Sequence, residues 1–181
     1  MGVILFSGVH GVGKGFFLEK VKQNVHQYEI YSASQLIEKY QPSTDAGYKK
    51  VKNIGNNQDV LIKALLNEMS TENKRIILDG HLCIFNAYGA VERIPEYFMQ
   101  EAQIMGIVLL QDVPSIICER INQRDENKLD VCDIEQMQKE EELYAIELKE
   151  KYGINYIVLT HDCNSEQFAE ELKRLGGSTD E

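Results

Sequence analysis

The chain has 181 residues, which is enough for one domain with its own hydrophobic core and too few for two ordinary domains. Apolar residues make up 43% and charged residues 27%, and the net charge of −10 disfavours broad binding to nucleic-acid phosphates. No apolar run approaches the roughly 20 residues of a membrane span, and four dispersed cysteines lack disulfide or zinc spacing, so we expect a single cytoplasmic domain over residues 1–181.

Short runs of β-branched residues alternate with helical patterns, which indicates βα units and a parallel sheet. We predict strands over residues 3–7, 29–32, 75–79, 104–111 and 154–160. Helices are predicted from Lys14, over 33–40 and 59–70, from Pro114, and over 133–152 and 165–175. Their spacing turns apolar side chains towards the core, namely Phe17, Leu18, Val21 and Val25 in the first helix and Ile116, Ile117 and Ile121 in the Pro114 helix.

A glycine-rich loop joins the first predicted strand to the first predicted helix. Its sequence is Gly-Val-His-Gly-Val-Gly-Lys over residues 8–14, the spacing of a phosphate-binding loop. Glycines let several backbone N–H groups converge on phosphate oxygens, the helix N-terminus adds partial positive charge, and Lys14 reaches the β- and γ-phosphates. We therefore predict nucleotide binding by Gly8, His10, Gly11, Val12, Gly13, Lys14, Gly15 and Phe16.

The residue after the lysine departs from the usual pattern. Gly15 stands where a serine or threonine would ligate Mg²⁺ directly, so the metal would depend on phosphates, water and a distant carboxylate. Asp79 ends an apolar strand, where a carboxylate is costly without a partner. We predict that Asp79 holds Mg²⁺ through water, and the bland alternative is a polar strand end.

Gly-x-x-Gly-x-Gly-Lys-Gly resembles the loop of adenylate kinases and other nucleoside-monophosphate kinases of the P-loop nucleotide kinase family. Further similar segments follow in the family's order over about three quarters of the chain: 30–37 after the second strand, Ile-Ile-Leu-Asp-Gly at 76–80, and the helix at 112–124. The resemblance implies a three-layer α/β/α P-loop domain, a five-stranded parallel sheet of order 2-3-1-4-5, an acceptor-region insertion over 41–57 and a short lid over 120–132.

The resemblance also implies roles for two arginines and for the acceptor region. Arg120 and Arg124 lie one helical turn apart and would contact ATP phosphates and the charge of the transferring group. Candidate acceptor contacts are Ser32, Ser34, His81 and Arg93. Either serine could instead cap the helix that begins at residue 33, and His81 could be incidental.

The acceptor half of the resemblance is weaker than the ATP half. Residues 32–74 contain lysines and no arginine, Arg93 stands alone between residues 80 and 119, and the helix 133–152 has none. Lysine does not reproduce the bidentate grip of arginine on phosphate.

These observations lead to one prediction of function with two alternatives. The first is an ATP- and Mg²⁺-dependent phosphotransferase of the nucleotide-kinase type, acting on a nucleotide or similar small acceptor. The second is an ATPase or nucleotide-dependent switch with a protein partner, for which the acidic helix face over 133–151 offers a docking surface; its simplest explanation is a solvated face. The third is a nucleoside or small-hydroxyl kinase, for which Asp45 and Asp79 are candidate bases.

Overall fold

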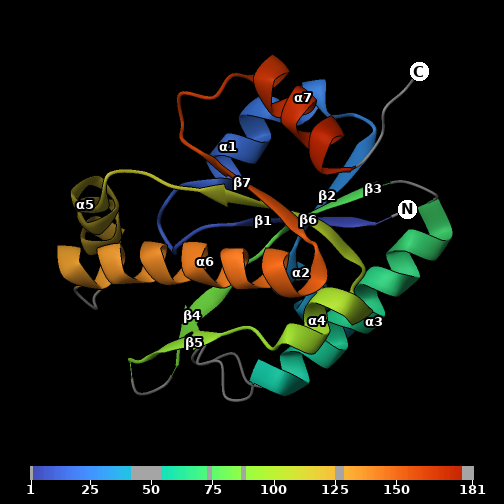
Figure 1. Cartoon of the computed structure of the whole chain (residues 1–181), viewed down its shortest axis with the longest axis horizontal. Helices are drawn as coiled ribbons and strands as arrows, with labels where there is room; N and C mark the ends of the chain where they lie inside the picture. The colour runs from blue at the N-terminus through green and yellow to red at the C-terminus, as the bar shows by residue number, and fades with distance from the viewer. Residues whose placement is uncertain (1, 42–53, 73–74, 87–88, 125–128, 177–181) are drawn as a thin grey trace.

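A five-stranded parallel sheet forms the centre of the computed structural model, which describes residues 2–41, 54–72, 75–86, 89–124 and 129–176 (Figure 1). Its spatial order is β2-β3-β1-β6-β7. Counted within this sheet alone, the order is 2-3-1-4-5, as the resemblance implied. The strands are β1 (Val3–Ser7), β2 (Tyr28–Ser32), β3 (Arg75–Asp79), β6 (Ile104–Leu110) and β7 (Asn155–Leu159).

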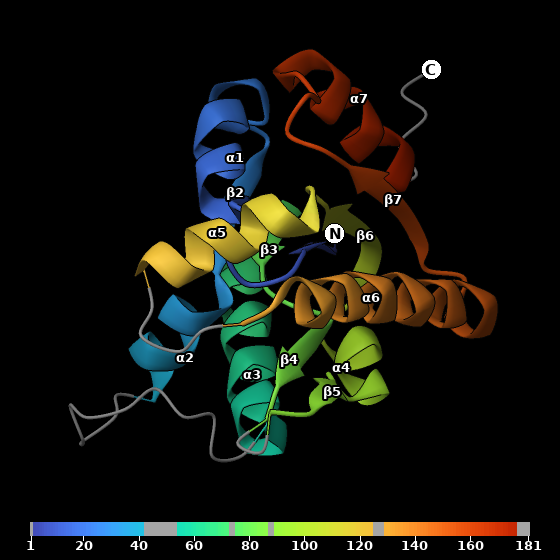
Figure 2. The same cartoon turned by 90° about the vertical axis from the view of Figure 1, so that its left-hand side faces the viewer.

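Helices cover both faces of this sheet, which confirms the predicted three-layer α/β/α class (Figures 1 and 2). One face carries α1 (Lys14–Val21), the short η1 (Lys22–Asn24) and α7 (Ser165–Leu175), and the other carries α3 (Ile54–Glu72), α4 (Glu96–Glu101) and α6 (Val131–Tyr152). β1 is buried along its whole length because it lies between helices on both sides. Aromatic rings pack together on the first face, where the ring centroid of Phe17 lies 5.5 Å from that of Phe6 and 5.2 Å from that of Phe168.

Two predicted helices agree with the structure in both of their limits. α2 (Ala33–Tyr40) and α7 have the expected limits, and Asn164 caps α7 in a capping box with Gln167. α6 begins two residues earlier than predicted because Asp130 forms a capping box with Asp133. The short helix α4 was not predicted.

One predicted core position is wrong. In α5 (Pro114–Arg124), Ile117 and Ile121 are buried, but Ile116 is 40% exposed. Neighbouring residues of a helix point about 100° apart, so Ile116 cannot share the inward face of both others.

A two-stranded antiparallel hairpin, also unpredicted, stands outside the main sheet. It pairs β4 (Cys83–Phe85) with β5 (Val91–Arg93). Arg93 holds it against α6 through ion pairs with Glu140 at 2.7 Å and Glu147 at 2.6 Å. Tyr144 adds a hydrogen bond from its hydroxyl to the Ile94 carbonyl at 2.6 Å. The acidic face of α6 is therefore partly used within the molecule.

Two predicted segments lie partly outside the described residues. Most of the acceptor-region insertion over 41–57, including Asp45, falls in residues 42–53, and the centre of the lid over 120–132 falls in residues 125–128. Both assignments stay predictions. None of the described helices combines the length and apolar character that a bilayer crossing requires.

Candidate active site

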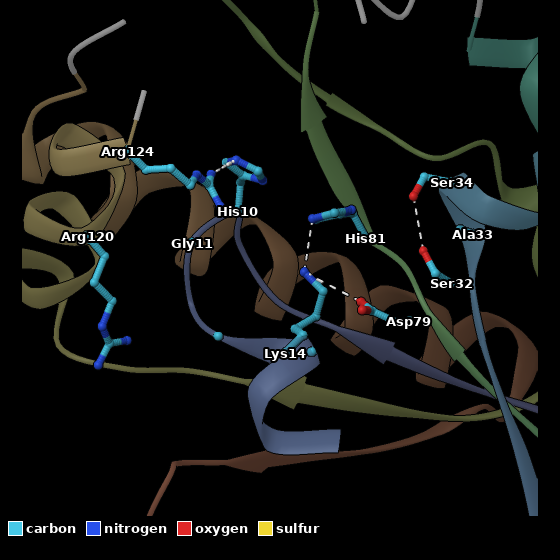
Figure 3. Close-up of a pocket in the computed structure, with 12 residues that line it drawn as sticks. His10, Gly11, Lys14, Ser32, Ala33, Ser34, Asp79, His81, Arg120 and Arg124 are labelled. Carbon is cyan, nitrogen blue, oxygen red and sulfur yellow. Dashed lines mark hydrogen bonds and ion pairs between the residues drawn. The ribbon is translucent and has the colours of Figure 1, made fainter. Parts of the chain in front are cut away.

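A cleft of about 470 Å³ opens at the carboxyl ends of β1, β2 and β3 (Figure 3). In parallel α/β sheets this edge is the usual place for ligands. Most of the predicted site residues meet here, although they come from distant parts of the chain. The cleft is lined by His10, Gly11, Gly13, Lys14, Gly15, Ser32, Ala33, Ser34, Asp79, His81, Arg120 and Arg124.

Two glycines of the loop have backbone conformations and surroundings that exclude a side chain. Gly11 has φ of +82°, and a Cβ atom there would lie 2.5 Å from Ile121 Cγ1. Gly13 caps α1 with φ of +97°, and a Cβ atom would lie 3.0 Å from a ring carbon of His161. The sequence therefore folds this loop tightly against α5 and the residues after β7, with its backbone along the cleft.

Lys14 lies at the bottom of the cleft with its side chain only 8% exposed. Its ammonium group donates to the Gly8 carbonyl at 2.8 Å and contacts His81 Nε2 at 3.0 Å. Burial lowers the pKa of Lys14, while the negative charges of Asp79 and Glu141 act to raise it. A buried cation facing a cleft is suited to bind an anion such as a phosphate group.

His81 is brought next to Lys14, which sequence reasoning left open. A lysine ammonium can only donate, so His81 Nε2 accepts and the ring proton lies on Nδ1. Burial and the nearby positive charges of Lys14 and His10 lower the pKa of His81 well below its usual value. His81 is therefore neutral at neutral pH, accepting from Lys14 at Nε2 and carrying its single ring proton on Nδ1.

Asp79 is the carboxylate that lines the cleft. It lies 3.9 Å from Lys14 Nζ with 24% of its side chain exposed, and burial raises its pKa. Among the described residues no cluster of three or more carboxylate, histidine or cysteine side chains could hold a metal alone. The donor set fits Mg²⁺ that is held mainly by nucleotide phosphates and water, with Asp79 as the protein partner. When bound, such an ion would neutralise phosphate charge.

The two lid-base arginines lie on the opposite side of the loop from Asp79 (Figure 3). Arg124 donates to His10 Nε2 at the tip of the loop. Arg120 forms an ion pair with Asp112 at 2.9 Å and reaches the Val12 carbonyl at 3.4 Å. Both arginines thus line the cleft, and their contact with ATP phosphates stays a prediction.

His161 is a site neighbour that sequence reasoning missed. It follows β7, and its Nε2–H donates to the Val12 carbonyl at 2.6 Å. The same nitrogen lies 3.9 Å from the Asp112 carboxylate. His161 therefore supports the loop from behind, and only its position after a predicted strand could have suggested this.

Of the remaining predicted residues, some line the cleft and others do not. Ser32 and Ser34 line the cleft and share a hydrogen bond at 3.0 Å, and Ser32 makes no capping bond to α2. Phe16 is 75% exposed and does not line the cleft. The structure does not bring Arg93 to the cleft, because Glu140 and Glu147 hold its guanidinium group on α6.

A second missed residue is Glu141, which lies in the acidic stretch expected to be solvated. Its side chain is 2% exposed and accepts hydrogen bonds from Ser7 Oγ at 2.9 Å and the Leu82 backbone N–H at 3.2 Å. Burial raises its pKa, whereas the charge of Lys14 lowers it. Glu141 therefore ties α6 to the two segments that carry Lys14 and His81.

A smaller cavity of about 170 Å³ adjoins the cleft and shares Ala33, Ser34 and His81 with it. Its other walls come from the sheet, α2, α3, α4 and the residues that flank and form the β4–β5 hairpin, namely Leu5, Ile37, Asn57, Gln58, Leu61, Leu78, Gly80, Ile84, Ile94 and Phe98. Arg93 thus supports a wall of this cavity without lining it.

Comparison with known proteins agrees with this geometry. Residues 7–138 match a family model described as an AAA domain. Among 364 solved chains of similar fold is a gluconokinase from Sinorhizobium meliloti 1021, with TM-score 0.51 and 13% identity over 97% of this chain and 92% of that chain. Another is the Deinococcus radiodurans tunicamycin resistance protein, with TM-score 0.63 and 13% identity over 98% and 96% of the two chains.

At such low identity these two structures establish the fold alone. No curated protein sequence matches the chain closely enough to count as a relative. The family model, by contrast, spans well over half of the chain and includes the loop lysine, Asp79 and both lid-base arginines. The chain therefore belongs to the AAA-domain family of P-loop proteins, and its resemblance to the P-loop nucleotide kinases is confirmed.

Proposed function

We propose that the protein is an ATP- and Mg²⁺-dependent phosphotransferase of the nucleotide-kinase type, which transfers the γ-phosphoryl group of ATP to a nucleotide or similar small acceptor. The observation that carries this proposal is the pair of adjoining cavities that meet at His81, beside Lys14. A phosphoryl transferase needs separate donor and acceptor sites whose reacting groups meet, whereas a hydrolase needs room only for water.

The residues of the cleft supply what such a transfer requires. The loop backbone and Lys14 would hold the β- and γ-phosphates, and Asp79 would position Mg²⁺ through water. Arg120 and Arg124 would face the charge that develops on the transferring group. Transfer of this kind depends on positioning and electrostatics, so no nucleophilic side chain is required.

In the reaction an acceptor oxygen forms a bond to the γ-phosphorus as the bond from that phosphorus to the β–γ bridging oxygen breaks. ADP leaves with the electron pair of the broken bond. The acceptor proton leaves by way of the transferred phosphoryl group and solvent, because a loose transition state does not require a strong base.

Transfer from γ-labelled ATP with Mg²⁺ tests this function directly. The acceptors are nucleosides, nucleoside monophosphates and water, with Lys14→Ala as the inactive control. We expect label on an organic acceptor in the wild-type protein and none in the variant. Release of phosphate to water alone, in the presence of every acceptor, would reject the transferase.

A partner-dependent ATPase or switch is the second candidate. The observation in its favour concerns arginines. Among the described residues, the walls of the two cavities carry Arg120 and Arg124 but no further arginine that could bind an acceptor phosphate. Its docking surface would be the acidic helix face over 133–151, although Glu140, Glu141 and Glu147 already have partners within the molecule. ATP hydrolysis that appears only with an added partner would identify it.

A further inference from the structure

The described walls of the smaller cavity, which would hold the acceptor under the proposed function, carry no permanent charge. None of the thirteen described residues around it is an aspartate, glutamate, lysine or arginine. His81, its one titratable side chain, accepts a hydrogen bond from Lys14 at its Nε2 atom at 3.0 Å, which leaves no proton on that nitrogen. A phosphate dianion placed here would lose its hydration without gaining a charged partner among these thirteen residues.

Most of the wall is apolar and buried. Leu5, Leu61, Leu78, Ile94 and Phe98 are all buried core residues that also face the cavity. An apolar cavity of about 150 Å³ is large enough to hold benzene. The space of about 170 Å³ therefore accommodates one ring-sized apolar body.

Two polar side chains of the wall, Asn57 and Gln58, have no partner in the described part of the chain, and Gln58 is the more buried of the two. Gln58 is 7% exposed, and no described residue forms a hydrogen bond with its side-chain amide. No fully buried side-chain nitrogen or oxygen of the described residues lacks a partner, so the Gln58 amide keeps some exposed surface, and Gln58 lines the cavity. A buried amide that faces a cavity offers two donors and one acceptor to a ligand.

The place where the smaller cavity joins the ATP cleft determines how an acceptor would be oriented. Ser34 and His81 line both spaces, and His81 lies 3.0 Å from the lysine that faces the γ-phosphate position. A ligand whose ring edge meets Gln58 would extend towards these two residues. A hydroxyl group at that end would lie at the point where transfer must occur.

We propose that the acceptor is an uncharged hydroxyl compound with a single ring and a hydrogen-bonding edge, the chemistry of a pyrimidine nucleoside, and not a nucleoside monophosphate. This inference rests on the proposed phosphotransferase function, whose acceptor class it narrows. The Gln58 amide forms hydrogen bonds with the ring edge, the apolar wall encloses the ring, and Ser34 and His81 face the hydroxyl group.

The first test compares acceptors that differ only in charge. Uridine, cytidine and thymidine are each assayed against their own 5′-monophosphates with γ-labelled ATP and Mg²⁺. We expect kcat/KM for at least one nucleoside to exceed that of its monophosphate by at least about tenfold, since an unpaired buried phosphate forfeits charge-assisted hydrogen bonds. Preference for the monophosphates would overturn the inference and leave the transferase standing. Label in water alone would reject both.

Nucleoside binding gives an answer that does not depend on turnover. We expect the nucleosides to raise the Tm of the wild-type protein and the monophosphates to raise it less. Nucleosides that neither accept label nor raise the Tm would overturn the inference.

Two variants of the wall test the assignment of residues. Gln58→Leu removes the amide at similar size, and we expect it to raise the KM for the nucleoside by about tenfold without changing the KM for ATP. Ile37→Lys adds the missing cation, and Ile37→Gln is its neutral control. We expect only the lysine variant to shift the preference towards the monophosphate. An unchanged nucleoside KM in folded Gln58→Leu, or equal preferences in both Ile37 variants, would contradict the assigned cavity.

Discussion

Replacing Glu141 should reveal how strongly the buried carboxylate holds the site together. Its oxygen accepts from Ser7 Oγ at 2.9 Å and from the Leu82 N–H at 3.2 Å, and the side chain is 2% exposed. In Glu141→Ala the Ser7 hydroxyl loses its acceptor, whereas the Leu82 N–H keeps Ser7 Oγ as a partner at 2.8 Å. The lost partner costs about 1–3 kcal/mol and the space left by a buried side chain adds to it, so we expect a loss of about 2–4 kcal/mol in the free energy of unfolding.

The matched control is Glu141→Gln, which keeps an acceptor oxygen and the side-chain size while removing the charge. We expect it to retain most of the stability, with a loss of about 1 kcal/mol. Urea unfolding at neutral pH measures both variants, and equal m-values would show that the same surface is exposed. Thermal unfolding should place Glu141→Ala about 5–15 °C below the wild type for a chain of this length.

The pH dependence tests the charge itself. Burial raises the pKa of Glu141 above its ordinary value of 4.5, so above pH 4.5 the folded chain retains a proton that the unfolded chain has lost. Stability therefore falls as pH rises from about 4.5 to the folded pKa, and then levels off. Relative to Glu141→Gln, the wild type should lose stability across this window. A flat or rising difference, or an alanine variant as stable as the wild type, would refute the reasoning.

Four further outcomes follow from the site. Lys14→Ala should weaken ATP binding about a hundredfold or more by calorimetry, because it removes a buried cation, and unchanged affinity in a folded variant would reject the site. Arg120→Ala should lower kcat more than it weakens ATP binding, and equal turnover would exclude it from catalysis. Arg93→Ala should loosen the β4–β5 hairpin and lower the stability by about 1 kcal/mol. It should raise the KM for the acceptor and leave the KM for ATP unchanged, and a change confined to the KM for ATP would contradict this placement. Gly13→Ala should lower the free energy of unfolding by about 1–2 kcal/mol because φ is +97°. Gly15→Ala has open space around it and should leave the free energy of unfolding unchanged or raise it. Urea unfolding measures both variants, and equal effects would argue against the loop geometry.

Local patterns were enough to predict most of the fold. Continuous Val, Ile and Leu runs indicated strands that are covered on both faces, and caps and helix-breaking residues marked α2 and α7 closely. The phosphate loop was predictable because its chemistry requires particular residue types at fixed spacing within one short segment. The same local signals, a lysine that closes the loop and a carboxylate that ends an apolar strand, were enough to single out Lys14 and Asp79.

The acceptor side depends on contacts between residues far apart in the chain, which leave no periodic signal. Glu141 belongs to an acidic stretch that resembles a solvated face, and only the packing of α6 against Ser7 and Leu82 buries it. Arg93 was a candidate ligand, but the hairpin places it on α6. The sequence by itself determined the nucleotide loop and the layers around the sheet, because both follow from local chemistry. Only the tertiary structure decided which side chains enclose the smaller cavity, because its described walls come from five separate parts of the chain brought together by packing.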